Sequence, residues 1–309
     1  MKSFSLKSSS GIAAIVFAIA ALIALPLRTI QYFTIIENNG TGFYKQTNWT
    51  VYVIGFILAV AVITLLVLGF INKKNFSYDL EVKSRPLFGL FSFVAAAGIF
   101  SDGIVCVLNA DKSNLLSRSR DLEEFIGILL ENSDIPFMYA EAILSVFAAI
   151  FLLALGISTL TGKTNGSEHK LISLIPVIWC LIRMIFRFSR TISYLRVSEL
   201  TFELLMLVFS AMFFMAFAQV NSQIGSKNSE WKLLGYGLPA ALFALVCFVP
   251  RLIVWVSGQR ELLYEYAATP NICELSNALF IIMTVFTRLS VGAKKEEEIP
   301  EDVKDKADA

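Results

Sequence analysis

The sequence predicts an all-α fold: a polytopic transmembrane helix bundle of about eight spans arranged as four hairpins, with one amphipathic helix on the outer surface. Three observations support this. Of the 309 residues, 56% are hydrophobic, which is above the share found in soluble domains. Apolar runs long enough to cross a bilayer recur along the chain. The charges inside these runs gather at one end of them.

Each predicted span is close to the roughly 20 helical residues that a hydrocarbon core of about 30 Å requires. The runs cover residues 11–36, 51–71, 87–109, 137–160, 171–188, 199–220, 232–256 and 271–289. Pro86, Pro136 and Pro270 lie just before or at the first turn of a run, where proline is tolerated. Glu274 and Asn277 dilute the last run, so seven spans remain the alternative.

The distribution of basic residues predicts the orientation. Of the 26 lysines and arginines, 15 fall on the side of the N-terminus and 11 on the other, where four of them lie within helices. The positive-inside rule then favours a cytoplasmic location of both termini and an even number of spans. We expect the membrane to be a bacterial plasma membrane. The first run continues through Arg28 to residue 36, too far for the core of a signal peptide, and is interpreted as an uncleaved span.

Two segments outside the predicted spans have distinctive sequence patterns. In the connection 110–136, apolar residues of the stretch 115–130 fall on one helical arc, which predicts an amphipathic helix lying on the outer surface. The tail 294–309 is charged and has few large apolar residues, so it is predicted to be disordered and cytoplasmic. Residues 1–293 form a single transmembrane domain in this interpretation.

Nine charged residues map to the same half of the membrane once this topology is drawn. A charge in hydrocarbon costs roughly 2.5–3.5 kcal/mol on insertion scales and usually has a partner or lies near water. The set therefore predicts a polar site or an ion-pair network. Its members are Arg28, Asp102, Glu141, Arg183, Arg187, Glu199, Glu203, Arg251 and Glu274.

These charges allow two functions. In the first, the protein is a permease or solute-binding membrane protein with an outward-facing pocket, because guanidinium groups bind carboxylates and phosphates bidentately. The ligand-binding residues would be Arg183, Arg187, Arg251 and Arg28, and their charge partners Glu199, Glu203, Glu274, Glu141 and Asp102. In the second, the protein is a structural or accessory subunit whose charges are internal ion pairs and whose partner is another membrane protein.

One pair is predicted specifically. The connection 189–198 is short, so the helices on either side of it are expected to be antiparallel neighbours. Arg187 and Glu203 lie one to two turns from this connection, at about 1.5 Å per residue, and should meet at similar depth.

The hairpins also resemble one another. Arginine lies near the outer end of the first helix in three of them, and glutamate opens the returning helix in three. A tandem repeat arising by duplication explains this pattern, and chance matches between short apolar strings are the alternative.

Several kinds of chemistry lack their usual residues. The single histidine, His169, lies in a polar loop, and the four cysteines show neither metal spacing nor a disulfide framework. No glycine-rich phosphate loop or serine elbow is present. We therefore expect no enzyme activity, no cofactor and no metal. The net charge of +1 gives no reason to expect nucleic acid, so the expected partners are the lipid bilayer and either a small anionic solute or another membrane protein.

Overall fold

The fold is described from a computed structural model, for residues 9–37, 43–45, 49–73, 76–78, 86–111, 134–162, 171–189, 198–222, 229–263 and 270–291. Within these ranges the chain is all-helical apart from two three-residue strands. The helices are α1 (Ser9–Thr34), α2 (Trp49–Ile71), α3 (Pro86–Asp111), α6 (Asp134–Thr161), α7 (Ile175–Ser189), α8 (Ser198–Asn221), α9 (Trp231–Val256) and α10 (Ile272–Arg288). The strands are β1 (Phe76–Tyr78) and β2 (Leu289–Val291), and single 3₁₀ turns lie at Ile172–Leu174 and Arg260–Leu262.

Six of these helices are long and apolar enough to cross a membrane, namely α1, α2, α3, α6, α8 and α9. Helices α7 and α10 have 15 and 17 residues. At 1.5 Å per residue they rise about 23 and 26 Å, less than a hydrocarbon core of about 30 Å. The apolar helices fit an integral membrane protein, and the count of eight spans stays a prediction.

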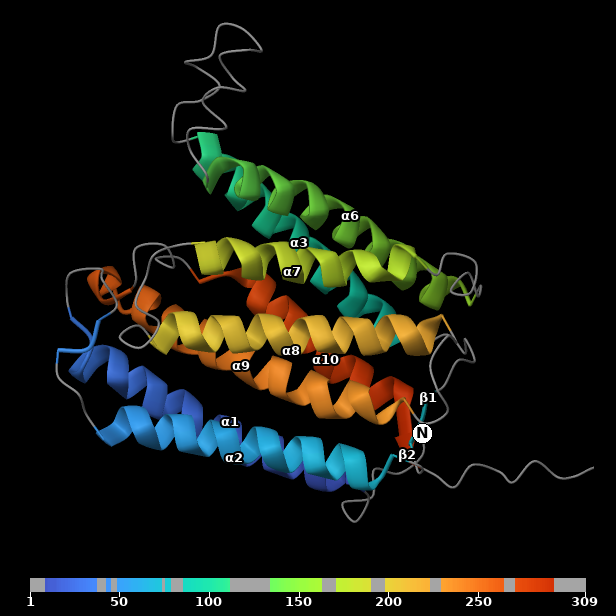
Figure 1. The fold of residues 1–309 in the computed structure, drawn as a ribbon, viewed down its shortest axis with the longest axis horizontal. Helices are drawn as coiled ribbons and strands as arrows, with labels where there is room; N and C mark the ends of the chain where they lie inside the picture. The colour runs from blue at the N-terminus through green and yellow to red at the C-terminus, as the bar shows by residue number, and fades with distance from the viewer. Residues whose placement is uncertain are drawn as a thin grey trace, which may run out of the picture.

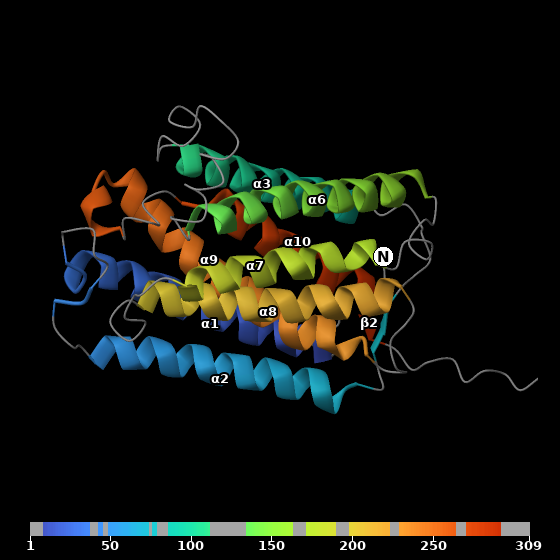
Figure 2. The ribbon, with the colours of Figure 1, turned by 45° about the horizontal axis from the view of Figure 1, so that its top comes forward.

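The helices form a ring with a hairpin beside it. Neighbours in the ring are α9, α10, α3, α6, α7 and α8, and α8 packs against α9 to close it. Helices α1 and α2 pack against each other and against α9. Figures 1 and 2 show α1 and α2 on one side of the molecule and α3 and α6 on the opposite side, with α7 to α10 between them. Helix α9 contacts α8 and α10 of the ring as well as α1 and α2, and it is the most buried of the six long apolar helices.

Small residues allow the ring to close tightly between α3 and α10. A Cβ atom added to Gly98 would lie 1.8 Å from the Ser276 Oγ and 3.3 Å from the Cys273 Cα. Close approach of this kind is typical of helix contacts inside membranes, where packing drives association. An alanine at Gly98 would therefore force the Ser276 side chain or the α10 backbone to shift.

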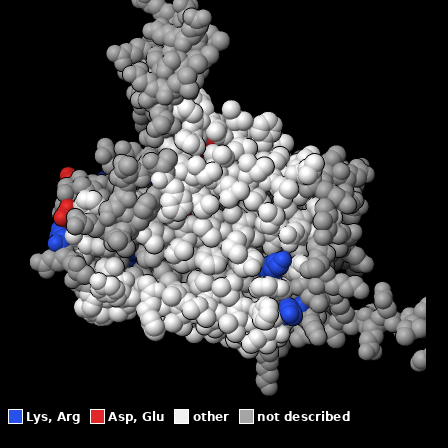
Figure 3. Space-filling model, in the orientation of Figure 1, with Lys and Arg blue, Asp and Glu red and all other residues white. Residues whose placement is uncertain are grey.

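The outer surface of the bundle is apolar. In α2 the buried residues recur every three or four positions, from Ile54 to Gly69, while Tyr52, Phe56 and Ile63 are at least 60% exposed. Figure 3 shows one face of the bundle, most of which is uncharged, with basic side chains exposed toward one end. Such a surface is stable against lipid tails, since these are as apolar as leucine.

The two ends of the described chain lie at the same end of the bundle. Strand β1, which follows α2, pairs in antiparallel register with β2, which follows α10, and Ser77 lies opposite Ser290. Figure 1 shows this strand pair at the end of the bundle where α1 begins. The predicted surface helix at 115–130 and the predicted disordered tail at 294–309 lie outside the described residues.

Candidate functional site

One cluster joins eight of the nine predicted charged residues. It takes at least one residue from each of the six ring helices, and we call it the charged layer. Its members are Asp102 of α3, Glu141 of α6, Arg183 and Arg187 of α7, Glu199 and Glu203 of α8, Arg251 of α9 and Glu274 of α10.

The alternating direction of the helices brings these residues to one level. The charges lie near the C-terminal ends of α3, α7 and α9 and near the N-terminal ends of α6, α8 and α10. Glu199 and Glu274 lie in the first turns of their helices, and Arg187 lies in the last turn of α7. Each of these three charges has the sign that the helix dipole favours at its position.

Arg183 is the centre of one half of the layer. Its Nη1 lies 3.2 Å from the Asp102 Oδ2, and its Nε lies 3.1 Å from the Glu141 Oε1. The guanidinium carbon lies 5.4 Å from the centre of the Trp179 ring, one turn earlier on α7. Asn271 donates a hydrogen bond of 2.6 Å to the other Asp102 carboxylate oxygen. The arrangement fastens α3, α6, α7 and α10 together.

Arg251 is the centre of the other half. Its Nε donates to the Glu199 carboxylate, and its Nη1 donates to the Glu274 Oε1 at 2.8 Å. All three side chains are at most 3% exposed. The second carboxylate oxygens, Oε2 of Glu199 and Oε2 of Glu274, are buried and have no hydrogen-bond partner among the described residues.

Glu203 connects the two halves. Its Oε1 accepts a hydrogen bond of 3.1 Å from the Arg187 Nε and lies 2.9 Å from the Arg187 Nη2. The same oxygen is 3.8 Å from the Arg183 Nη2, and Oε2 is 3.9 Å from the Arg251 Nη2. One carboxylate thus faces three guanidinium groups, and the contact between Arg187 and Glu203 is the one expected from the short connection between their helices.

Arg28, the ninth residue, is held beside the layer. Its Nη1 donates hydrogen bonds to the Gln31 Oε1 at 3.0 Å and to the Tyr44 hydroxyl at 3.1 Å, and its guanidinium lies over the Tyr32 ring. Tyr44 reaches this position because the chain turns back after α1, with a β-bridge between Ile36 and Tyr44. Arg28 is 2% exposed, so these contacts replace the water that it would otherwise bind.

One group of side chains has metal-ligating atoms at short range. Single ligand atoms of Asp102, Cys106 and Glu141 lie within 4.8 Å of one another. The Arg183 guanidinium contacts both carboxylates of this group, so it already supplies the positive charge that a metal ion would bring. We therefore assign no metal to these residues. All four cysteines are described and free.

The sequence interpretation identified the charges and missed their neutral partners. Trp179 and Arg183 are four residues apart on one helix face, a spacing that brings side chains together. Asn271 is the N-cap of α10, where its side chain accepts from the Cys273 backbone N–H; asparagine before a helical run is a recognisable signal. The contact of Asn271 with Asp102 on α3 has no sequence signal, because the residues are 169 positions apart.

Comparisons with protein-family models, with curated proteins and with solved structures found no match for this chain.

Proposed function

We propose that this protein is a membrane permease or solute-binding membrane protein that takes up a small anionic molecule at Arg183, Arg187 and Arg251. The observation that carries the proposal is the position of Glu203, whose carboxylate faces all three guanidinium groups at 2.9–3.9 Å. A carboxylate or phosphate of a substrate has the same charge and similar geometry. Glu203 therefore occupies the place that a bound anion would take.

Exchange between Glu203 and a substrate gives a simple binding mechanism. The Arg187 side chain is 17% exposed, whereas those of Arg183 and Arg251 are 2% exposed, so an incoming anion meets Arg187 first. It displaces the Glu203 carboxylate, which then needs a proton or an outward rotation to avoid repulsion. Arg183 and Arg251 stay positioned by Asp102, Glu141, Glu199 and Glu274. Planar guanidinium groups fixed in this way lose little freedom on binding.

A second candidate is an accessory membrane subunit whose charges serve only as internal ion pairs between helices. It is supported by the pairing itself, since each arginine of the charged layer lies within 4 Å of at least one carboxylate. In that case the partner is another membrane protein, and no anion competes with Glu203.

The two candidates differ in how the purified protein responds to anions. Thermal unfolding in detergent would be followed with acetate, succinate and inorganic phosphate, and with chloride at equal ionic strength as the reference. Glu203→Gln removes the carboxylate that competes with the anion. The added anion should therefore stabilise this variant in a saturable way and by more than it stabilises the wild type. An anion at ten times its Kd stabilises by about 1.4 kcal/mol.

The matched control is the double variant Glu203→Gln with Arg187→Gln, which keeps the neutral residue but removes one arginine. It should lose most of the anion response. If no anion stabilises Glu203→Gln more than chloride does, the permease proposal is wrong and the accessory-subunit candidate stands.

The proposal includes eight spans in a bacterial plasma membrane with both termini in the cytoplasm. The pairing of β1 with β2 supports an even count, because it holds the end of α10 at the same end of the bundle as the end of α2. A cysteine placed at Lys45 in a cysteine-free background should react with an impermeant maleimide in intact cells, and one at Lys73 only after lysis. The reverse pattern would exclude this orientation.

A further inference from the structure

A groove runs along the outside of α8, away from the charged layer. It has a volume of about 280 Å³. Its floor is formed by small and flexible residues of α8, including Ala211, Ala216 and Met215, and its walls come from α7 and α9. The groove forms because alanines on α8 leave space between its two flanking helices, which both pack against it.

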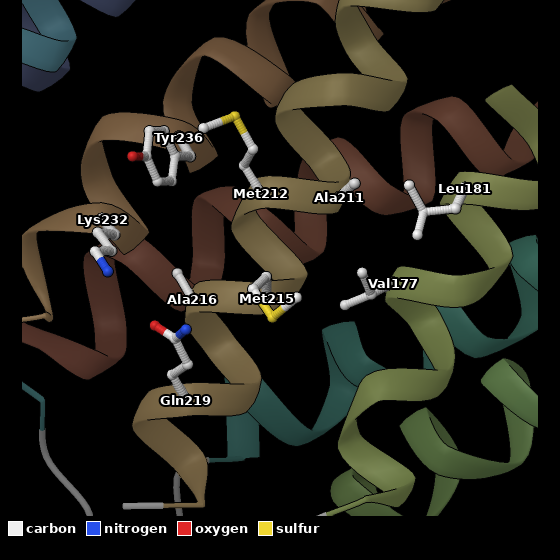
Figure 4. Close-up of a pocket in the computed structure, with 9 residues that line it drawn as sticks. All are labelled: Val177, Leu181, Ala211, Met212, Met215, Ala216, Gln219, Lys232 and Tyr236. Atoms are coloured by element: carbon white, nitrogen blue, oxygen red, sulfur yellow. The ribbon is translucent and has the colours of Figure 1, made fainter. Parts of the chain in front are cut away.

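The polar and apolar lining residues come mainly from different sides of the groove. Lys232 and Tyr236 belong to α9 on one side of α8, Val177 and Leu181 belong to α7 on the other side, and Gln219 and the methionines belong to α8 itself. Figure 4 shows Lys232 and Gln219 near each other and away from Leu181. A polar part beside an apolar part matches the division of a lipid molecule into headgroup and acyl chain.

The positive charge of Lys232 indicates which kind of lipid headgroup would bind. Lys232 is the second residue of α9 and follows Trp231, a residue type enriched at the level of lipid headgroups. Among the described residues, no carboxylate lies within salt-bridge distance of its ammonium group. A lysine in a pocket between membrane helices attracts anionic headgroups.

We propose that this groove binds a phospholipid with an anionic headgroup, whose phosphate contacts Lys232 and whose acyl chain lies against Val177, Leu181 and Met215. Gln219 and Tyr236 supply further hydrogen-bonding groups beside Lys232. Methionine suits such a surface because its flexible thioether adapts to chains of different conformation. The site is independent of the proposed anion site, since none of the lining residues belongs to the charged layer.

Native mass spectrometry of the full-length protein, titrated in detergent with phosphatidylglycerol or with phosphatidylcholine of the same acyl chains, tests the proposal. The wild type should retain phosphatidylglycerol in preference to phosphatidylcholine. Lys232→Gln should weaken phosphatidylglycerol binding roughly five-fold, the change expected for one lysine at an anionic surface, and should remove the preference. Lys73→Gln is the matched control, because Lys73 lies at the same end of the bundle, where Phe70 and Trp231 are in ring contact.

A second variant tests the acyl-chain part. Ala211→Leu fills the groove and should weaken binding of both lipids, whereas Ala59→Leu makes the same change on the exposed surface of α2 and should not. Met215→Trp blocks the same groove from a residue that is already 41% exposed, so it is the substitute if Ala211→Leu does not fold.

Three results would overturn the proposal. Equal retention of the two lipids by the wild type would show that the headgroup is not recognised. Equal losses in Lys232→Gln and Lys73→Gln would indicate an unspecific surface charge. A groove-filling variant that binds lipid as the wild type does would show that the chain lies elsewhere.

Discussion

Replacing Arg251 by glutamine should destabilise the protein more than the same replacement of Arg187. The guanidinium of Arg251 is the nearest cation of both Glu199 and Glu274, and the two carboxylates are 3% and 1% exposed. Arg251→Gln leaves both of them buried without that cation. Breaking one buried pair by removing one partner costs about 3–5 kcal/mol, so we expect a loss of at least that size.

Arg187→Gln provides the comparison. Arg187 is 17% exposed and has one carboxylate partner in the layer, Glu203. After its removal, Glu203 still lies 3.8 Å from Arg183 and 3.9 Å from Arg251. The loss is then that of a hydrogen bond to a charged group, about 1.5–3 kcal/mol. Arg251→Gln should therefore cost more, because it leaves two carboxylates without a near cation, whereas Arg187→Gln leaves none.

Both variants can be measured by unfolding the purified protein from mild detergent with increasing dodecyl sulfate, followed by the fluorescence of its four tryptophans. A triple variant, Arg251→Met with Glu199→Leu and Glu274→Leu, removes the whole charge group and should recover much of the stability, because well-packed hydrophobic residues of similar volume often replace buried ion pairs at little cost. A loss below about 1 kcal/mol for Arg251→Gln, or a larger loss for Arg187→Gln, would refute this reasoning.

Two further predictions follow from contacts between neighbouring helices. In a double-mutant cycle on unfolding, Arg187→Ala and Glu203→Ala should show a coupling of roughly 0.5–3 kcal/mol, the range for residues in contact, and additive effects would show that the pair is not coupled. Gly98→Ala should cost about 1–3 kcal/mol through overpacking against Ser276, and Ser276→Gly should restore part of this, since the obstructing Oγ and Cβ atoms both belong to Ser276. Gly55→Ala, which meets open space, is the control; an equal loss there would contradict the packing explanation.

The sequence was informative where hydrophobic length and charge decide the structure. Apolar runs place helices close to the observed ones, and the alternation of their direction explains why Asp102 and Glu274 share a level. The contact of Arg187 with Glu203 followed from a short connection, because adjacent antiparallel helices have few ways to pack. In each case the result follows from the length of an apolar run or of a connection.

The sequence does not predict which helices meet to close the ring. Helices α3 and α10 are far apart in the chain, and their contact depends on the fit of Gly98 against Ser276, which a hydropathy pattern does not record. For the same reason, the sequence does not predict that Arg183 contacts both Asp102 and Glu141. The repeat of hairpins also stays a prediction: consecutive helices do pack in pairs, but α9 contacts α1 and α2 as well as α8 and α10.

The balance of charge bears on the choice between the two candidate functions. The nine residues comprise four arginines and five carboxylates, so the fully ionised set has one excess negative charge. Ion pairs that only hold helices together do not require such an excess. Apolar residues of similar volume would hold the helices together at an equal or lower cost in folding free energy. In the proposed binding mechanism the excess matters, because an anion enters the charged layer only when a carboxylate is protonated or moves away from the arginines. Glu203 faces three cations at once and is the carboxylate whose departure frees the most positive charge. This is why the anion response of Glu203→Gln, rather than its stability alone, separates a transport site from a structural one.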